Sequence, residues 1–453
     1  PKHDNTTMKR YGLLLITICI AFFACIQAPA QAKKSKQSTT DKVLSKIHAV
    51  NLNDSIEIYK ELLKNTPIEP EFMLMPRFAI VDGHGKFVFS VGANLKFTAS
   101  YDWGNPVNNP KGMNLNKITK SLPGDHQLFQ MSAGGSGIFF NILGFPNSAN
   151  AIGLFISIGV DDGDNNKYVL DAGQIYMRFR EFKAGYATSL YSDKAADAYN
   201  IDGEGACASG SHSCVQVNWQ HKFTPRIGFG AGVELPSVSL THITEGLPEE
   251  IEQLKQKTAR QNIPDIPAYV DYNWDEGRSH VRLSTMLRTM HYVDFIEKKD
   301  RYKPGWGLKL TTALDFSPFK IFGMMQGGRG IANFIHDNSD LGLDMVPDQN
   351  DAGNMLLTSS LGAIAAVQYN ISPKMFVTAQ YSFLRNIVPE YTMESTHPFK
   401  DQIRIGHTAT ANFIWRISSL FNAGVEYKMG NRRNYDGTSL FNNRLYFMLL
   451  MNF

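Results

Sequence analysis

The last ten residues of the chain alternate in a way that restricts the fold. Every odd position from Leu445 to Phe453 is apolar, whereas the even positions include Arg444, Tyr446 and Asn452. Successive side chains of a β-strand point to opposite faces, so this segment is predicted to be a strand with one fully apolar face. A strand of this kind that ends on an aromatic residue is typical of the closing strand of an outer-membrane β-barrel. Phe453 is then the signal that barrel-insertion machinery reads.

The same alternation recurs through most of the chain. In the clearest case, residues 87–103, the odd positions are apolar almost throughout and most even positions are polar. Strands of soluble sheets are usually about 5–6 residues long, whereas this run is nearer the roughly 10 residues of a membrane-spanning strand with a rim at each end. About 16 such segments can be recognised, and an even number is what bacterial single-chain barrels have.

Short and long connections alternate between these segments. Short turns are expected near residues 145–149, 180–181, 224–225, 275–277, 317–318, 371–373 and 417–419. Longer connections are expected near residues 104–126, 191–213, 241–264, 293–304, 331–353, 386–401 and 431–439. Membrane barrels show this pattern because their periplasmic turns are short and their outer loops are long. The sequence therefore predicts an all-β fold, a transmembrane antiparallel up-and-down β-barrel of about 16 strands.

Residues 1–32 are predicted to be upstream residues and a signal peptide. Lys9 and Arg10 form a positive n-region, residues 12–26 form an apolar region, and Ala30-Gln31-Ala32 fits a small-residue cleavage site. The apolar run is short for a spanning helix. We therefore expect export, cleavage after Ala32 and a location in the bacterial outer membrane.

The segment between the leader and the barrel has a different pattern. Residues 33–70 are polar and then carry apolar side chains at helix-like spacing, up to two prolines. We expect a short periplasmic helical or linker segment there, followed by the barrel over residues 71–453. Residues 72–81 are apolar enough to form a plug, an extra strand or a linker, and the pattern does not separate these alternatives.

Charge and cysteine content narrow the partners. The formal net charge is +3 and loss of residues 1–32 removes a net +2, which leaves 3 − 2 = +1; this is no basic excess of the kind that nucleic-acid binding requires. Cys207 and Cys214 remain in a loop-like stretch of an exported chain, so a disulfide between them is the simplest prediction. His212 alone adds too few ligands for a metal site. We expect no metal and no cofactor.

Several stretches occur in a recognisable order along the predicted barrel. Phe182-Lys-Ala-Gly-Tyr-Ala-Thr-Ser-Leu-Tyr-Ser-Asp193 follows an arginine-containing strand, Val233-Glu-Leu-Pro236 ends another, and Ile263-Pro-Asp-Ile-Pro-Ala-Tyr-Val270 leads to His280-Val-Arg-Leu283. This order resembles the DcaP-like outer-membrane porins over most of residues 86–453, as pattern more than identity. The resemblance implies a 16-stranded trimeric porin with a periplasmic extension and a preference for small anionic solutes. The weak heptads and the cysteine-containing loop depart from that family pattern.

The lumen-phase positions of the predicted strands carry more cations than acids. A porin selects by its width and by the charges that line it, and the planar fork of arginine pairs with a carboxylate or a phosphate at two points. We therefore predict a pore-lining, anion-selective set: Arg178, Arg180, Arg282, Arg288, Arg404, Lys96, Lys309 and Lys428. The alternative is that several of these pair with neighbouring acids, such as Asp102 or Glu426, and only brace the wall.

Two of the expected long connections are candidates for a constriction. Loop 191–213 carries several acids, and loop 241–264 has a helical pattern with an early proline and acids in its first turn. Each loop either folds into the lumen or covers the mouth of the barrel, and the sequence leaves both arrangements open.

The predicted function is passive diffusion of small hydrophilic solutes, with anions such as carboxylates favoured by the lumen arginines and an infolded loop. The expected partners are outer-membrane lipid, the barrel-assembly machinery, small anionic solutes and two further copies in a homotrimer. One alternative is a plugged barrel that transports hydrophobic substrates. A lesser alternative is an outer-membrane lipase, but Ser284 is in lumen phase while His291 and His407 are in outward phase, and G-x-S-x-G is not found. No enzymatic activity is expected.

Overall fold

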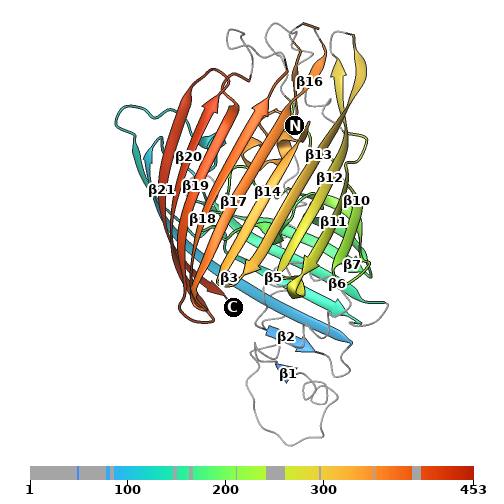
Figure 1. Cartoon of the computed structure of the whole chain (residues 1–453), viewed down its shortest axis with the longest axis vertical. Helices are drawn as coiled ribbons and strands as arrows, with labels where there is room; N and C mark the ends of the chain where they lie inside the picture. Colours follow the sequence, from blue (N-terminus) through green and yellow to red (C-terminus); the bar gives the residue numbers. More distant parts are fainter. Residues whose placement is uncertain are drawn as a thin grey trace, which may run out of the picture. The chain divides into compact units, whose positions relative to one another are not determined.

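The barrel wall of this protein is one closed antiparallel sheet (Figure 1). The computed structural model describes residues 48–49, 78–81, 86–145, 150–162, 167–210, 212–240, 261–294, 297–348, 350–351, 353–389 and 399–452. Within these residues sixteen strand positions form the wall, because β4 and β5 both pair with β3 and share one position. The ring closes where β21 pairs with β3, from Asn442 opposite Gly104 to Asn452 opposite Asn94.

The strands follow the expected order along the chain. They are β1 (His48–Ala49), β2 (Phe78–Val81), β3 (Phe87–Gly104), β4 (Gln127–Ser132), β5 (Gly137–Gly144), β6 (Ile152–Asp162), β7 (Tyr168–Phe179), β8 (Phe182–Thr188), β9 (Ser213–Lys222), β10 (Ile227–Glu234), β11 (Ile266–Trp274), β12 (Ser279–Asp294), β13 (Lys299–Phe316), β14 (Phe319–Arg329), β15 (Met345–Pro347), β16 (Met355–Leu357), β17 (Ser359–Ser372), β18 (Met375–Ile387), β19 (Ile403–Arg416), β20 (Phe421–Asn434) and β21 (Ser439–Asn452).

Short 3-10 turns lie between some of the strands. They are η2 (Leu115–Lys117), η4 (Lys194–Ala196), η5 (Asp275–Gly277), η6 (Ala332–Phe334) and η7 (His336–Asn338). In the part of the chain described here, no helix has the length and apolar character that a helical membrane span would need.

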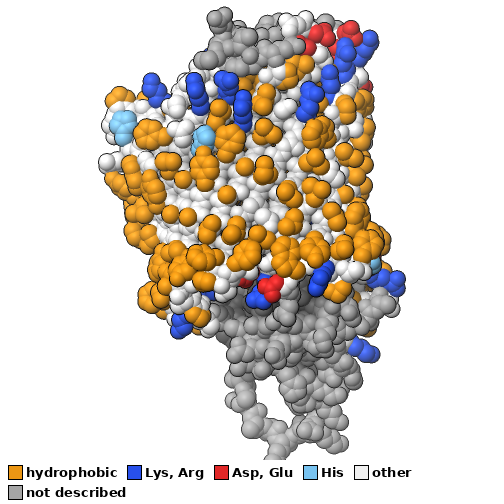
Figure 2. Space-filling model, in the orientation of Figure 1, with side chains coloured by type: hydrophobic (Ala, Val, Ile, Leu, Met, Phe, Trp, Pro, Cys, Tyr) orange, Lys and Arg blue, Asp and Glu red, His pale blue; other side chains and the backbone are white. Residues whose placement is uncertain are grey.

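The two faces of the wall differ as the alternation predicts. On β21, Phe447 and Leu449 are 52% and 57% exposed, whereas Tyr446 and Met448 between them are 1% and 2% exposed. Figure 2 shows the outward side chains as a broad hydrophobic zone with charged side chains along its upper and lower borders. This arrangement suits lipid outside and polar or packed side chains inside. The predicted all-β barrel is confirmed.

The N-terminal predictions are tested only in part. Residues 78–81 form β2, which pairs with residues 88–91 of β3, so the extra-strand alternative holds for this piece of residues 72–81. His48 and Ala49 pair with β2 as a two-residue strand rather than as helix. The leader, the rest of residues 33–70 and the terminal Phe453 lie outside the described residues.

Two of the predicted long connections are wrong. β12 runs to Asp294 and β13 starts at Lys299, and β20 and β21 are separated only by residues 435–438. The physical reason is that strand ends beyond the lipid are polar on both faces and resemble loops in sequence. Hydrogen bonds across the ladder still hold them, and the Arg301 guanidinium adds a 2.8 Å bond from Nε to Asp294.

The seam between the first and last strands contains a buried ion pair. Arg444 of β21 and Asp102 of β3 are paired in register, and both side chains are 0% exposed. The second contact, from Arg444 Nη2 to Asp102 Oδ2, is 2.7 Å long. Removal of one member leaves an uncompensated charge inside the barrel, which typically costs about 3–5 kcal/mol.

We predict that Arg444→Met lowers the temperature at which the purified barrel unfolds and reduces its refolding yield, because Asp102 loses its partner. The measurement is thermal unfolding followed by the heat-modifiable gel shift. The matched control is Arg226→Met, since Arg226 is exposed in the turn between β9 and β10 and surface changes usually stay within about 0.5 kcal/mol. Equal melting temperatures of the two variants would contradict a stabilising role for the Arg444–Asp102 ion pair.

Candidate functional site: loops inside the lumen

Three long connections turn inward and pack against the inner wall. They are loop 105–126 after β3, loop 189–212 after β8 and loop 330–358 after β14. Ile201 of the second loop is fully buried against Phe376, Ile414 and Tyr446 of the wall. The three loops also meet one another, in a cluster of buried apolar side chains from all three and from β18, β19 and β21: Val107, Met113, Leu115, Ile118, Cys207, Ile335, Leu384, Ile403 and Leu440.

Loop 189–212 begins on the β10–β13 side of the barrel. The Glu234 carboxylate of β10 accepts from Ser189 Oγ at 2.7 Å and from the Leu190 amide at 2.8 Å. Asp193 then accepts from Thr311 Oγ at 2.6 Å and contacts His280 Nε2 at 2.8 Å. Burial opposes the charge on Asp193, but Arg282 and His280 outweigh it and hold its pKa below the usual range. This end of the loop is therefore fixed to the wall by two carboxylates, Glu234 of the wall and Asp193 of the loop.

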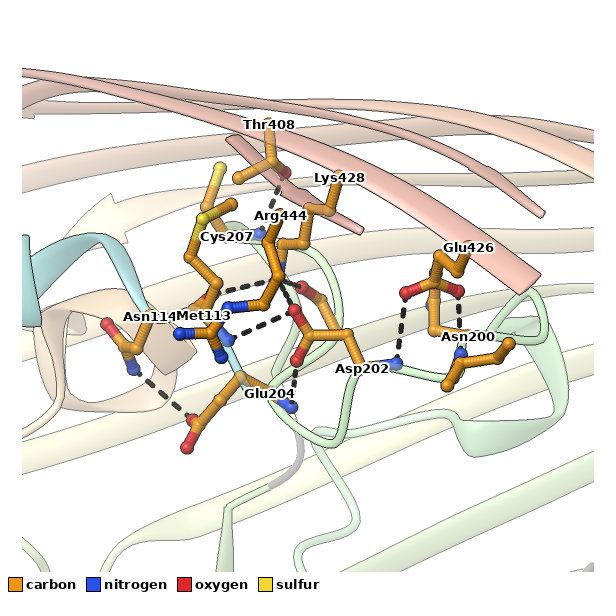
Figure 3. A network of polar contacts seen from close by, with 12 residues as sticks. Met113, Asn114, Asn200, Asp202, Glu204, Cys207, Thr408, Glu426, Lys428 and Arg444 are labelled. Atoms are coloured by element: carbon orange, nitrogen blue, oxygen red, sulfur yellow. Dashed lines mark hydrogen bonds and ion pairs between the residues drawn. The ribbon is translucent and has the colours of Figure 1, made fainter. Parts of the chain in front are cut away.

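The loop next reaches β20 (Figure 3) and β3. The Glu426 carboxylate accepts from the amides of Ile201 and Asp202, at 2.6 and 3.0 Å. Lys428, two residues further along β20, donates to Asp202 Oδ2 at 2.6 Å, and both side chains are 1% exposed. Lys96 Nζ of β3 donates to the Ile201 carbonyl at 2.7 Å. The wall thus supplies acceptors to loop amides and donors to loop oxygens.

On its way back to β9 the loop is held by hydroxyl and amide side chains. The Ala208 amide donates to Ser382 Oγ of β18 at 3.0 Å. The Ala208 carbonyl accepts from Gln326 Nε2 of β14 at 2.8 Å. The Cys207 amide donates to Thr408 Oγ of β19 at 3.3 Å. Loop 189–212 therefore contacts strands on opposite sides of the ring and crosses the lumen.

Loop 105–126 is held by arginines of the last two strands. Arg444 donates to the carbonyls of Asn109 and Val107, at 2.7 and 2.5 Å. Arg432 of β20 donates to the carbonyls of Leu115 and Asn116, at 3.0 and 2.7 Å. A guanidinium has five donors in a fixed plane, so one arginine can satisfy several carbonyls of a loop that has no strand partner.

Loop 330–358 is held by Arg288 of β12. This side chain is 0% exposed; it contacts Asp265 at 3.0 Å and Asp344 at 3.5 Å, and it donates to the Gly330 carbonyl at 2.7 Å. Burial raises the pKa of Asp344, and the charge of Arg288 opposes that shift. Arg288 therefore joins β12 to the residue before β11 and to two residues of the infolded loop.

A histidine and two acids join the loops to one another. His336 of loop 330–358 contacts Glu204 of loop 189–212, and the Leu115 amide donates to Asp337 Oδ2 at 3.0 Å. Burial disfavours the charge on His336, but the bond to Glu204 and the charge of Asp337 outweigh it and raise its pKa. Burial raises the pKa of Asp337 to about 6. This junction lies outside the membrane-spanning strands.

The predicted pore-lining cations fall into distinct environments. Arg288 and Lys428 are buried in ion pairs with loop carboxylates. Lys96 donates to a loop carbonyl. Lys309 is 2% exposed, with its Nζ 4.3 Å from the centre of the Tyr191 ring. These four side chains brace the wall and its loops.

The other four predicted cations are placed differently. Arg282 is partly exposed, contacts Asp193 and Asp271, and stacks on Tyr269. Arg178 is 4% exposed and points inward. Arg180 is exposed at the β7–β8 turn and donates to Asn150 Oδ1 at 2.9 Å. Arg404 lies in a β-bulge, where Ile403 takes the buried inward position instead. Arg180 and Arg404 therefore do not continue a ladder along the wall.

The predicted disulfide is wrong. Cys207 and Cys214 are both free and buried. Cys207 Sγ lies 3.3 Å from Ser382 Oγ, deep in loop 189–212, whereas Cys214 is in β9 and pairs in register with Ala187 of β8. Burial raises the pKa of the Cys207 thiol to about 12. The infolding of the loop separates two cysteines that are close in sequence.

Sequence reasoning missed most of the anchoring acids of the loops. Asp193, Asp202, Glu204 and Asp344 lie in irregular segments, where no periodicity indicates the direction of a side chain. A usable signal was present in β20, because Glu426 and Lys428 are two residues apart and therefore share the inward face.

Comparison with solved structures agrees with this geometry. The crystal structure of the outer membrane channel DcaP of Acinetobacter baumannii is similar with a TM-score of 0.68, at 18% identity, over 81% of this chain and 98% of that chain. The chain has a DcaP-like porin fold. An anion-selective porin from Comamonas acidovorans is similar to this DcaP-like chain with a TM-score of 0.52, at 10% identity, over 81% of this chain and 100% of that one. No protein-family model matches the sequence, and a search of curated proteins returns no match.

We predict that the loop junction weakens as the pH rises. The pKa of His336 is raised above its usual value of 6.5, so its stabilising charge is complete below pH 6.5 and is lost as the pH passes the raised value. The pKa of Glu204 is lowered from 4.5, since His336 outweighs its burial, so its contribution is present above pH 4.5 and lost in acid. The contact is therefore strongest near pH 6.

The measurement compares wild-type protein with His336→Gln by thermal unfolding at pH 6 and pH 9. At each pH, the melting temperature of His336→Gln is subtracted from that of the wild type. This difference should be larger at pH 6 than at pH 9. The difference is the readout because Asp337 and the other carboxyls titrate in both chains. A difference that stays constant from pH 6 to pH 9 would show that the charge on His336 does not hold the loops.

Proposed function

We propose that this chain is an outer-membrane channel for passive diffusion of small hydrophilic solutes, with a preference for anions such as carboxylates. The observation that carries the proposal is the crossing of the lumen by loop 189–212, which is anchored at Glu234, Asp193, Glu426 and Ser382. A loop that is fixed across a barrel narrows the path, and a narrow path lined by charges filters solutes by size and sign.

The inner wall beside the loop supports hydrophilic rather than apolar cargo. The inward face of β9 carries Gln216, Asn218 and Gln220, and that of β18 carries Thr378 and Gln380. Amide and hydroxyl groups exchange hydrogen bonds with water and with polar solutes at little cost. A hydrophobic-substrate transporter would instead need a continuous apolar pocket along its path.

The preference for anions rests on inward cations of β7, β8 and β12. Arg178 and Lys183 are directly opposite each other in register on β7 and β8, and both have their side chains on the inner face. Arg282 is partly exposed on β12. Cations on the inner face of a confined space raise its positive potential, which lowers the electrostatic cost of admitting a carboxylate or a phosphate. The anion selectivity of the Comamonas acidovorans porin is consistent with such a mechanism on this fold.

The proposal includes partners and an assembly state. We infer that the barrel lies in the outer membrane after removal of its signal peptide, that the assembly machinery inserts it, and that it forms a homotrimer as the DcaP-like resemblance implies. The apolar outer face supports insertion in lipid. Native mass spectrometry of the detergent-purified protein tests the trimer, and a monomer at micromolar concentration would contradict it.

We predict discrete single-channel steps in a planar bilayer and a reversal potential of the anion-selective sign under a potassium chloride gradient. Arg178→Gln should reduce this selectivity, because it removes one of two adjacent cations from the inner face. The matched control is Arg180→Gln, since Arg180 is two residues away on the same segment but exposed at the turn. Cation selectivity of the wild type, or an equal effect of the two variants, would contradict the anion filter. Folded barrel without any conductance would contradict the open channel.

A further inference from the structure

The outer face of the barrel carries exposed arginines at the end where the long loops emerge. Arg385 of β18 and Arg433 of β20 are both exposed and outward-facing. Arg385 pairs in register with Ile405 of β19, and Ile405 pairs with Arg433. Neighbouring strands lie about 4.8 Å apart, so the two Cα atoms are separated by roughly 10 Å. Their long side chains can therefore reach one headgroup.

This face of the barrel has a largely basic border. Figure 2 shows Lys and Arg side chains gathered along the upper edge of the hydrophobic zone, with Asp and Glu side chains among them at the upper right. Arg329 of β14 is also exposed and outward-facing at this end. Among the described residues, no carboxylate forms an ion pair with Arg329, Arg385 or Arg433. By contrast, the inward cations Arg288, Lys428 and Arg444 are all paired with acids.

The surface changes in character with each step from the arginines toward the middle of the wall. The next outward layer consists of Phe383, His407 and Asn431, which are in register on β18, β19 and β20. The layer below it consists of Tyr381, Ala409 and Met429. The Tyr381 hydroxyl lies 2.7 Å from His407 Nδ1, which links the polar layer to the apolar one. The outward side chains therefore change from two arginines, through a layer that mixes His407 and Asn431 with Phe383, to a mainly apolar layer.

We propose that Arg385 and Arg433 form a binding site for the phosphate groups of a phosphorylated glycolipid in the outer leaflet. His407 and Asn431 then face its sugar, and Tyr381 and Met429 face its acyl chains. This inference rests on the outer-membrane placement proposed above and is independent of solute conduction. Guanidinium groups suit the site because they pair with phosphate at two points and are more weakly hydrated than ammonium groups.

The order of the layers favours a membrane glycolipid over a free anion. A free phosphate would need only the arginines, whereas a lipid also uses the polar layer and the apolar surface below. Basic clusters at the edge of a membrane span bind anionic lipid headgroups by charge attraction. The side of the barrel with the long loops is also the side that faces the outer leaflet.

The test measures binding of purified diphosphorylated lipid A, in detergent, to the full-length barrel by native mass spectrometry and microscale thermophoresis. The variant is Arg385→Ala/Arg433→Ala. The matched control is Arg226→Ala/Lys374→Ala, which removes two exposed cations from the short-turn rim. Each arginine near an anionic membrane surface is worth roughly a fivefold factor in affinity, so the double variant should bind roughly thirtyfold more weakly. The control should bind as the wild type does.

Further arms separate the possible outcomes. Lipid A from which both phosphates have been removed should bind as weakly to the wild type as intact lipid A binds to the double variant. The proposed phosphate site would be overturned if the double variant bound lipid A as tightly as the wild type does. It would also be overturned if the wild type bound the dephosphorylated lipid as tightly as intact lipid A. Inorganic phosphate that binds as tightly as lipid A would overturn the glycolipid assignment. The heat-modifiable gel shift of the same preparation shows that the variant is folded, and this control does not depend on conduction.

Discussion

The infolded loops depend on charged side chains of the wall that satisfy loop backbone groups. A loop inside a barrel has no strand partner, and its amides and carbonyls lose free energy unless something replaces water. Here Glu426 accepts from two consecutive amides, and Arg432 and Arg444 donate to four carbonyls of loop 105–126. Charged groups form the stronger hydrogen bonds, so a few wall residues fix long irregular segments.

This use of charge limits what remains for selectivity. Lys428 and Arg288 are buried against loop carboxylates, and each would be costly to expose or to leave without its partner. They therefore determine where the loops lie, and the loops determine the path. Arg178 and Lys183 act more directly in the proposed filter because their side chains lie on the inner face of β7 and β8, whereas Arg282 is also paired with Asp193 and Asp271. Bracing and filtering are thus assigned to different members of one set of inward cations.

The barrel could be predicted from the sequence because its signal is periodic. Strict alternation across β3 and β21 reflects two different solvents on the two faces of one strand. Only the inward direction of site residues on strands could be predicted, as for Arg282 and Lys428. Asp193, Asp202 and His336 lie in loops, and their positions follow from contacts between distant segments. The separation of Cys207 from Cys214 has the same origin.

The most direct test measures how firmly the wall charges hold loop 189–212. Spin labels at Asn200, next to the two residues that Glu426 and Lys428 hold, and at Lys374 of the β17–β18 turn report their separation by pulsed electron resonance in a chain with no other cysteine. The account predicts one narrow distance distribution for the wild-type wall and a broad one for Glu426→Ala/Lys428→Ala. A broad distribution in the wild type, or an unchanged narrow one in the variant, would contradict the claim that these charges fix the loop across the lumen.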